Sequence, residues 1–254
     1  MEMRQALCEC LDEMMAENEN IVVIDADLAK PNGTFPLRKK YPERAIDVGI
    51  AEQNMASVAA GMSSYGFIPF ITSFTPFASR RICDQIAISI AYAKQNVKII
   101  GSDPGISAEF NGGTHMSMED IGVLRSIPEL VIYEPVDVAQ FKQALPQIVA
   151  YEGPVYIRMF RKTIDDVFTD ANYKFDLFGA DCIQEGTAVT IFCSGIMVQE
   201  TMKANEILKQ EGIDAEIINI HTIKPIDRDA VVASAKKTGA VVVAENHNVI
   251  GGLT

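Results

Sequence analysis

A single carboxylate, Glu52, stands where the sequence pattern predicts the start of a helix, and its surroundings suit proton transfer. Residues 45–48 read as a short strand that Gly49 breaks, and a helix rich in small residues is expected over 52–65. The sequence neighbours of Glu52 are apolar or small, namely Ile50, Ala51, Met55 and Val58. In a water-poor pocket a carboxyl group keeps its proton more readily and can exchange it with a bound molecule. The plainer interpretation is that Glu52 only complements the positive amino end of its helix.

Two phenylalanines, Phe74 and Phe77, follow the strand that is predicted over 67–71. In open α/β sheets, ligands bind beyond the carboxyl ends of the strands, which is where these two rings are expected. Aromatic side chains there can stack against a flat heteroaromatic ring. For an isolated pair of phenylalanines, ordinary core packing is the alternative interpretation.

The elements that must position these residues alternate between strand and helix. Short apolar runs predict strands at 21–24, 67–71, 97–100, 130–133 and 155–157. Helical patterns lie between or before them at 4–18, 52–65, 77–94, 119–126 and 138–150. Strands that are apolar along their whole length are typical of a parallel sheet covered on both faces. The fold class is therefore α/β.

A second, smaller α/β region is expected near the end of the sequence. The pattern lapses from about 161 to 186 and then resumes with strands at 188–193, 215–220 and 240–244 and helices at 198–210 and 227–237. We place a first domain at 1–165, a linker at 166–180 and a partial second domain at 181–254. Three strands and two helices leave part of such a layer uncovered, so a truncated domain is the expectation.

Composition excludes several classes of partner. The formal net charge is −12, which argues against nucleic acid and anionic membrane surfaces. No apolar run reaches transmembrane length. The five cysteines match no zinc or disulfide spacing, which favours reduced thiols in a cytoplasmic protein.

Several segments together resemble the transketolase family. They are the glutamate segment Asp47-Val48-Gly49-Ile50-Ala51-Glu52-Gln53-Asn54-Met55, then Ala26-Asp27-Leu28, Gly112-Gly113-Thr114-His115 and His221-Thr222-Ile223-Lys224-Pro225-Ile226-Asp227. Residues 1 to about 165 resemble the pyrimidine-binding domain, and about 180 to 254 resemble the front part of the carboxy-terminal domain. The resemblance implies that thiamine diphosphate is the cofactor, that Glu52 activates it, and that Phe74 and Phe77 form the wall of its pyrimidine site.

The sequence lacks the Gly-Asp-Gly motif, followed by an Asn, with which this family holds the cofactor's diphosphate and its metal. The chain thus looks like the second subunit of a split transketolase, whose diphosphate-binding domain is a separate polypeptide. The resemblance implies that this partner holds the Mg2+ or Ca2+, that this chain has no metal ligands, and that two copies of each chain assemble into a heterotetramer.

The resemblance also implies where the sugar binds. Arg4, His115 and Arg161 match positions that bind the phosphate of the substrate, and Arg158 is near enough in sequence to compete with Arg161. Two substrate positions depart from the family pattern: the usual Asp is Asn111 and a usual His is replaced at Asp103. Because asparagine carries no charge, the preferred hydroxyl pattern should differ. We expect an unusual or branched phosphorylated sugar, or a sulfonated analogue.

Three other interpretations compete with the split transketolase. Two are enzymes: the β subunit of a 2-oxo-acid dehydrogenase E1 component, and a relative of deoxyxylulose-phosphate synthase. The sugar-phosphate residues Arg4 and Arg161 argue against a 2-oxo acid. The third is a non-catalytic orphan pyrimidine domain that binds a partner or nothing.

Overall fold

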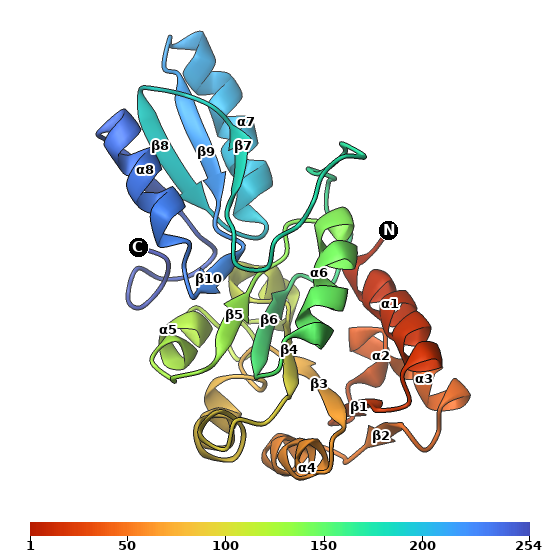
Figure 1. The fold of residues 1–254 in the computed structure, drawn as a ribbon. Helices are drawn as coiled ribbons and strands as arrows, with labels where there is room; N and C mark the ends of the chain where they lie inside the picture. Colours follow the sequence, from red (N-terminus) through yellow and green to blue (C-terminus); the bar gives the residue numbers. More distant parts are fainter.

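Eleven strands form two separate sheets in the computed structural model, which describes residues 1–254 (Figure 1). The larger sheet has seven strands in the order β10-β5-β6-β4-β3-β1-β2, and the smaller has four in the order β11-β8-β9-β7. The strands are β1 Ile21–Asp25, β2 Ala45–Asp47, β3 Ile68–Phe74, β4 Lys98–Ser102, β5 Val131–Tyr133, β6 Val155–Met159, β7 Asp181–Gln184, β8 Val189–Cys193, β9 Ala215–Asn219, β10 Thr222–Lys224 and β11 Val241–Ala244.

Helices connect these strands and cover the sheets. The α-helices are α1 Met3–Glu17, α2 Ala29–Asn32, α3 Phe35–Lys40, α4 Glu52–Ser64, α5 Asp120–Arg125, α6 Val138–Ala150, α7 Met197–Gln210 and α8 Arg228–Thr238. Three further helical segments are the 3₁₀ turn η1 Arg80–Ile82, the π-helix η2 Gln85–Tyr92 and the 3₁₀ segment η3 Gly105–Asn111. The helix predicted over 77–94 is therefore present as a 3₁₀ turn and a π-helix. No helix is both long and apolar enough to cross a bilayer.

The larger sheet is buried on both faces, as its apolar strands predict. Along β3, Phe70 packs into a core shared with α1 and α6, while the next residue, Ile71, packs into a core shared with α4, η2 and α5. Ile100 and Ile99 divide between the same two cores in β4. Because side chains alternate across a strand, each buried strand feeds both cores. The predicted α/β fold with a parallel sheet is confirmed.

All neighbouring strands of the larger sheet are parallel except the pair β10 and β5, so their carboxyl ends meet at one edge. Glu52 follows β2, Phe74 ends β3, Asp103 follows β4 and Arg161 follows β6. Arg4 reaches this edge from α1, since its backbone N–H donates to the carbonyl of Arg161 at 3.0 Å. The fold thus gathers the predicted site residues at the edge where open α/β sheets bind ligands.

The end of the chain differs from the predicted pattern in two ways. Strand β7 lies within the stretch that the sequence presented as irregular, and it pairs antiparallel with β9, which gives the second sheet a fourth strand. Strand β10 leaves that sheet and pairs antiparallel with β5 of the larger one. The second domain therefore contributes a strand to the larger sheet, and the backbone hydrogen bonds of that strand join it to the first domain in addition to the connecting chain (Figure 1).

Candidate active site

The turn before Glu52 is held by the carboxylate of Asp47, the last residue of β2. Its Oδ1 accepts hydrogen bonds from the backbone N–H groups of Gly49 and Asp27, each at 2.9 Å. Gly49 has a φ of +73°, a conformation that residues with side chains rarely adopt. Burial raises the pKa of Asp47, but these amides and the Arg38 guanidinium outweigh it and hold the pKa of Asp47 below its usual range. An ionised carboxylate therefore fixes the turn that leads to Glu52.

Glu52 is the first residue of α4, and its side chain is buried beside Arg81. It is only 4% exposed, and its Oε1 accepts a hydrogen bond from Arg81 Nη1 at 2.7 Å. The same guanidinium lies over the ring of Phe77, with Cζ 3.8 Å from the ring centroid. A flat, delocalised cation thus donates to Glu52 and stacks on Phe77 at the same time. The site accepts a planar group that has a donor nitrogen at its edge.

The ring of His115 lies between the two predicted phenylalanines. Its centroid is 5.4 Å from that of Phe74 and 5.2 Å from that of Phe77, and both contacts are edge-on. The phenylalanine centroids are 6.4 Å apart. His115 Nδ1 lies 2.9 Å from Thr114 Oγ1. The structure therefore joins the residues predicted for the cofactor to a residue predicted for the substrate in one aromatic cluster.

Two predicted anion ligands, Arg4 and Arg161, lie side by side. The Nη1 atoms of both residues are 3.4 Å from the carbonyl oxygen of Pro31. The guanidinium of Arg161 also lies over the ring of Phe74, with Cζ 4.9 Å from the centroid. Arg4 pairs with Glu2, Nε to Oε2 at 2.7 Å. The two guanidinium groups can thus act together on one anion next to the aromatic cluster.

The structure gives Asp103 a different contact from the predicted one. This residue is 1% exposed, its Oδ1 accepts from the backbone N–H of Arg161 at 3.1 Å, and its Oδ2 pairs with the Nε of the same residue. Both oxygens of Asp103 therefore face Arg161, and its side chain is not presented to a sugar hydroxyl. Asn111, in contrast, is exposed at the end of η3.

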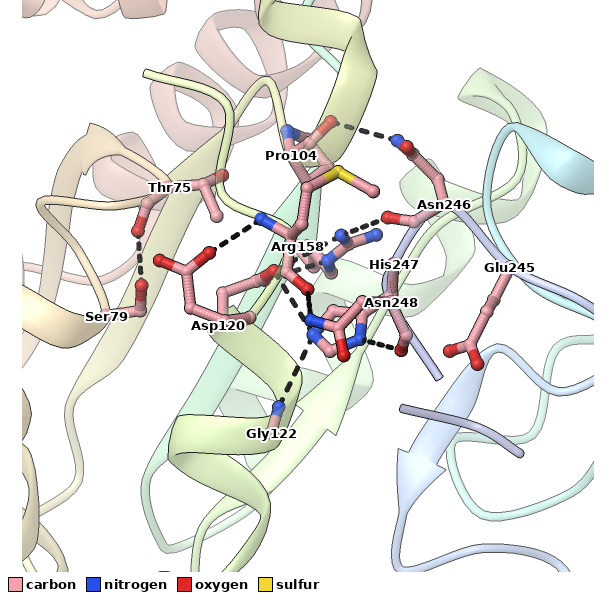
Figure 2. A network of polar contacts seen from close by, with 12 residues as sticks. Thr75, Ser79, Pro104, Asp120, Gly122, Arg158, Glu245, Asn246, His247 and Asn248 are labelled. Atoms are coloured by element: carbon pink, nitrogen blue, oxygen red, sulfur yellow. Dashed lines mark hydrogen bonds and ion pairs between the residues drawn. The ribbon is translucent and has the colours of Figure 1, made fainter. Parts of the chain in front are cut away.

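Arg158 does not compete with Arg161 for an anion. Its side chain is fully buried, and it donates to Asp120 at 2.8 and 3.2 Å, to Glu134 at 2.6 Å and to the carbonyl of Asn246 at 2.7 Å. These acceptors engage every nitrogen of the guanidinium, so Arg158 joins the two domains instead of binding a ligand (Figure 2).

One group of side chains has metal-ligand types, but its chemistry does not favour a metal. Cys182, Glu185 and Glu216 lie close together on the second sheet. The ammonium of Lys237 already pairs with both glutamates, at 2.6 Å in the case of Glu216. Burial, followed by the nearby Glu185 charge, raises the pKa of the Cys182 thiol to about 11, which disfavours the thiolate that metals bind.

Two residues at this site were not predicted from the sequence. Arg81 follows Phe77 by four positions, so helical spacing could have indicated its contact with that ring. Asn246 lies 140 residues from Ile106, to which it is hydrogen-bonded, and no local pattern points to that pairing.

Comparison with known proteins agrees with the fold. Residues 1–165 match the family described as transketolase, pyrimidine binding domain, and residues 179–254 match transketolase, C-terminal domain. The chain belongs to the transketolase family.

Relatives narrow the class further. The chain is 52% identical to the 6-deoxy-6-sulfo-D-fructose transketolase subunit SqwH of Clostridium sp. (strain MSTE9), over 99% of this chain and 78% of that protein. It is 31% identical to one subunit of the apulose-4-phosphate transketolase of Phocaeicola vulgatus, over 98% of this chain and 80% of that protein. A solved split gene transketolase, described as an inactive β4 tetramer, superposes with a TM-score of 0.90 at 41% identity over 100% of this chain and 82% of that one. This chain is the section of a split transketolase that holds the pyrimidine-binding and C-terminal domains.

Membership in this family implies thiamine diphosphate, and the residues around Glu52 fit the aminopyrimidine end of that cofactor. The fit rests on Arg81. Its planar guanidinium donates a hydrogen bond to Glu52 and stacks on the ring of Phe77, and a flat nitrogen-containing ring would need these same two contacts. Arg81 thus occupies the Oε1 atom of Glu52 and one face of Phe77 in this structure.

Proposed function

We propose that this chain supplies the pyrimidine-binding half of a thiamine diphosphate site and transfers ketol units between sugars once a separate diphosphate-binding subunit has joined it. The observation that carries the proposal is the buried carboxylate of Glu52 beside the face of Phe77, in a setting that accepts a planar nitrogen-bearing group. A carboxyl group at this place can hold a proton against a ring nitrogen.

Each residue of the site has a role in this proposal. Thiamine diphosphate, when bound, supplies the carbon nucleophile that attacks the ketose carbonyl. Glu52 holds the proton at the ring nitrogen, Phe77 and Phe74 form the ring wall, and His115 adds an imidazole to Arg4 and Arg161 at the anionic end of the sugar. Asn111 is exposed near this histidine in sequence and offers an uncharged amide to a sugar hydroxyl.

The partner subunit, in this proposal, holds the diphosphate and its Mg2+ or Ca2+. The absence of the diphosphate motif from the sequence supports this division. The solved relative is described as a split gene transketolase and as inactive in its β4 tetramer, which supports a requirement for a second chain. We extend the proposal to two copies of each chain, since this family builds its active sites between protomers.

For the substrate, we propose a ketose that carries a sulfonate on its terminal carbon. The 52% identity to a 6-deoxy-6-sulfo-D-fructose transketolase subunit supports this choice over a phosphate ester. The charges of the anion site agree with it. Arg161 is paired with Asp103 and Arg4 is paired with Glu2, so the two cations are already compensated. The paired carboxylates repel a bound anion, and this repulsion lowers the binding free energy less for a singly charged sulfonate than for a phosphate ester, which carries nearly two charges at neutral pH.

Reconstitution tests the proposal. The purified chain is mixed with its diphosphate-binding subunit, thiamine diphosphate and Mg2+, and ketol transfer is measured over sulfonated and phosphorylated ketoses, with 2-oxo acids included. Glu52→Gln keeps the shape of the side chain but cannot exchange a proton, so turnover should fall by about 100- to 10,000-fold while the subunits still assemble. Glu119→Gln is the matched control, because Glu119 also pairs with an arginine, Arg80, at 2.5 Å.

Four results would contradict the proposal. Full turnover by Glu52→Gln would remove the central role of the carboxyl group. Tight cofactor binding by the isolated chain would contradict the division of the site between two subunits. An assembled complex that transfers no ketol unit from any ketose would favour a non-catalytic pyrimidine domain, and activity on 2-oxo acids would favour the dehydrogenase class.

A further inference from the structure

A short segment after β11, residues 245–248 of the second domain, is hydrogen-bonded to both ends of residues 104–118, the loop of the first domain that carries Asn111 and His115. Figure 2 shows the contact of this segment with Pro104. Asn246 makes the central contact. Its Nδ2 donates to the carbonyl of Pro104 at 2.9 Å, and its Oδ1 accepts from the backbone N–H of Ile106 at 3.0 Å. The amide is 3% exposed, so one buried side chain brackets the start of the loop with both its donor and its acceptor.

The same segment also holds the far end of the loop. The backbone N–H of Asn248 donates to the carbonyl of Met118 at 3.1 Å, and the side-chain Nδ2 of Asn248 donates to the same carbonyl. Within the loop, the N–H of Gly105 donates to the carbonyl of Ser117 at 2.9 Å. Both ends of the loop are thus joined to each other and to a single segment of the second domain.

The glycine at position 105 is required by this arrangement. Its φ is +56°, in the left-handed region, and a Cβ at this position would overlap the amide of Asn246. The close approach of Asn246 to the loop backbone therefore depends on a residue without a side chain.

A buried ion cluster fixes the segment in place. The carbonyl of Asn246 accepts from Arg158 Nη2 at 2.7 Å, and Arg158 also pairs with the carboxylate of Asp120 (Figure 2). The carboxylate of Glu134 holds the other side of the same guanidinium. Glu134 in turn accepts from Ser194 Oγ, which belongs to the second domain, at 2.7 Å. Since all these groups are buried and partnered, Asn246 has little freedom to move relative to the loop.

We propose that Asn246 is a positioning residue, through which the second domain sets the conformation of the loop that presents Asn111 and His115 to the sugar. The proposal rests on the proposed function for the identity of these two substrate residues. It gives the carboxy-terminal domain a part in catalysis although none of its side chains is assigned to the cofactor or the substrate.

The test compares variants of the complete two-subunit complex. Asn246→Ala removes both side-chain hydrogen bonds, and Asn246→Asp keeps the size of the side chain but loses the donor to Pro104. The matched control is Asn205→Ala, because Asn205 is a buried amide of the same domain, 1% exposed, that bonds only Gln184. Hydrogen–deuterium exchange is followed for residues 105–118, and kcat, KM and thiamine diphosphate affinity are measured.

Both Asn246 variants should speed exchange in the loop about tenfold, while Asn205→Ala leaves it unchanged. The ratio kcat/KM for the ketose should fall about 10- to 100-fold because the substrate groups are misplaced, with the cofactor affinity unchanged. Unchanged exchange in the loop, or a kinetic loss no larger than that of Asn205→Ala, would overturn the positioning role. Failure of the proposed function is recognised separately, since the unaltered complex would then transfer no ketol unit.

Discussion

Replacing Asp103 by asparagine should shift the preference of the enzyme from a terminal sulfonate toward a terminal phosphate. The carboxylate of Asp103 is buried and faces the guanidinium of Arg161, so it repels any anion that binds on the other side of that guanidinium. A phosphate ester has a second pKa near 6 and carries nearly two charges at pH 7.5, whereas a sulfonate carries one. Removal of the repulsion therefore helps the phosphate more.

The size of the effect can be worked from the distances. Two anions on opposite sides of one guanidinium lie roughly 7 Å apart, and at an effective dielectric constant of about 20 each pair of unit charges then repels by about 2.4 kcal/mol. The phosphate feels about twice the repulsion of the sulfonate, so the difference between the substrates is about 2.4 kcal/mol, or about 50-fold in relative kcat/KM. Screening at the exposed side of Arg161 makes this an upper value, and a shift of about 10- to 50-fold is expected.

The assay measures kcat/KM for 6-deoxy-6-sulfofructose and fructose 6-phosphate with the reconstituted complex at pH 7.5. Asparagine keeps an oxygen for the backbone N–H of Arg161, so the geometry of the site should persist. The control is Glu109→Gln, which removes the same formal charge from an exposed position in the neighbouring loop.

The reasoning is refuted if Asp103→Asn changes both substrates by the same factor, because the carboxylate would then contribute geometry and not charge. It is also refuted if Glu109→Gln changes the ratio of kcat/KM between the two ketoses by the same factor, because the net charge of the chain would then cause the effect.

Two further predictions concern the cofactor pocket and pH. Arg81→Ala should tighten thiamine diphosphate binding by the complex about tenfold in calorimetry. The half-exposed ion pair of Arg81 with Glu52 and its contact with Phe77 together contribute about 1–2 kcal/mol, which the cofactor must displace when it binds. Arg80→Ala is the control, and weaker cofactor binding by Arg81→Ala would contradict the idea that Arg81 and the cofactor compete for these contacts. Burial raises the pKa of Asp181 to about 6, so the folded chain binds more protons than the unfolded chain between about pH 4 and 6, and the carboxylate costs stability above that window. Asp181→Asn should therefore stabilise the chain by up to about 3 kcal/mol at pH 7.5 and hardly at all at pH 4 in urea unfolding, and an equal gain at both pH values would exclude this cause.

The larger sheet and the edge that carries the site could be predicted because their signals are local. The runs at 21–24, 97–100 and 155–157 are apolar at nearly every position, which parallel strands buried on both faces require. Once the strands are known to be parallel, residues that follow them must meet at one edge. Glu52, Phe74 and Arg161 could therefore be placed together without knowledge of any contact between them.

The strands β7 and β10 could not be predicted, because distant partners stabilise them. The sequence of β7 is Asp181-Cys182-Ile183-Gln184, which has no apolar run, and it becomes a strand through antiparallel pairing with β9. The short β10 pairs with β5 across the boundary between the two domains. In both cases the backbone hydrogen bonds to another strand outweigh the weak local preference.

Asp103 shows why the role of a site residue is harder to predict than its location. The sequence places it correctly after β4, and its difference from the family pattern indicates a change in substrate. Only the structure shows that both its oxygens face Arg161, which is 58 residues away. Because Coulomb repulsion falls only with the first power of distance, a buried carboxylate can select between anions that it never touches. When a charged residue departs from the family pattern, its effect on the substrate therefore depends on the charges that the fold places next to it. Here the pairing of Asp103 with Arg161 sets the preference between a sulfonate and a phosphate.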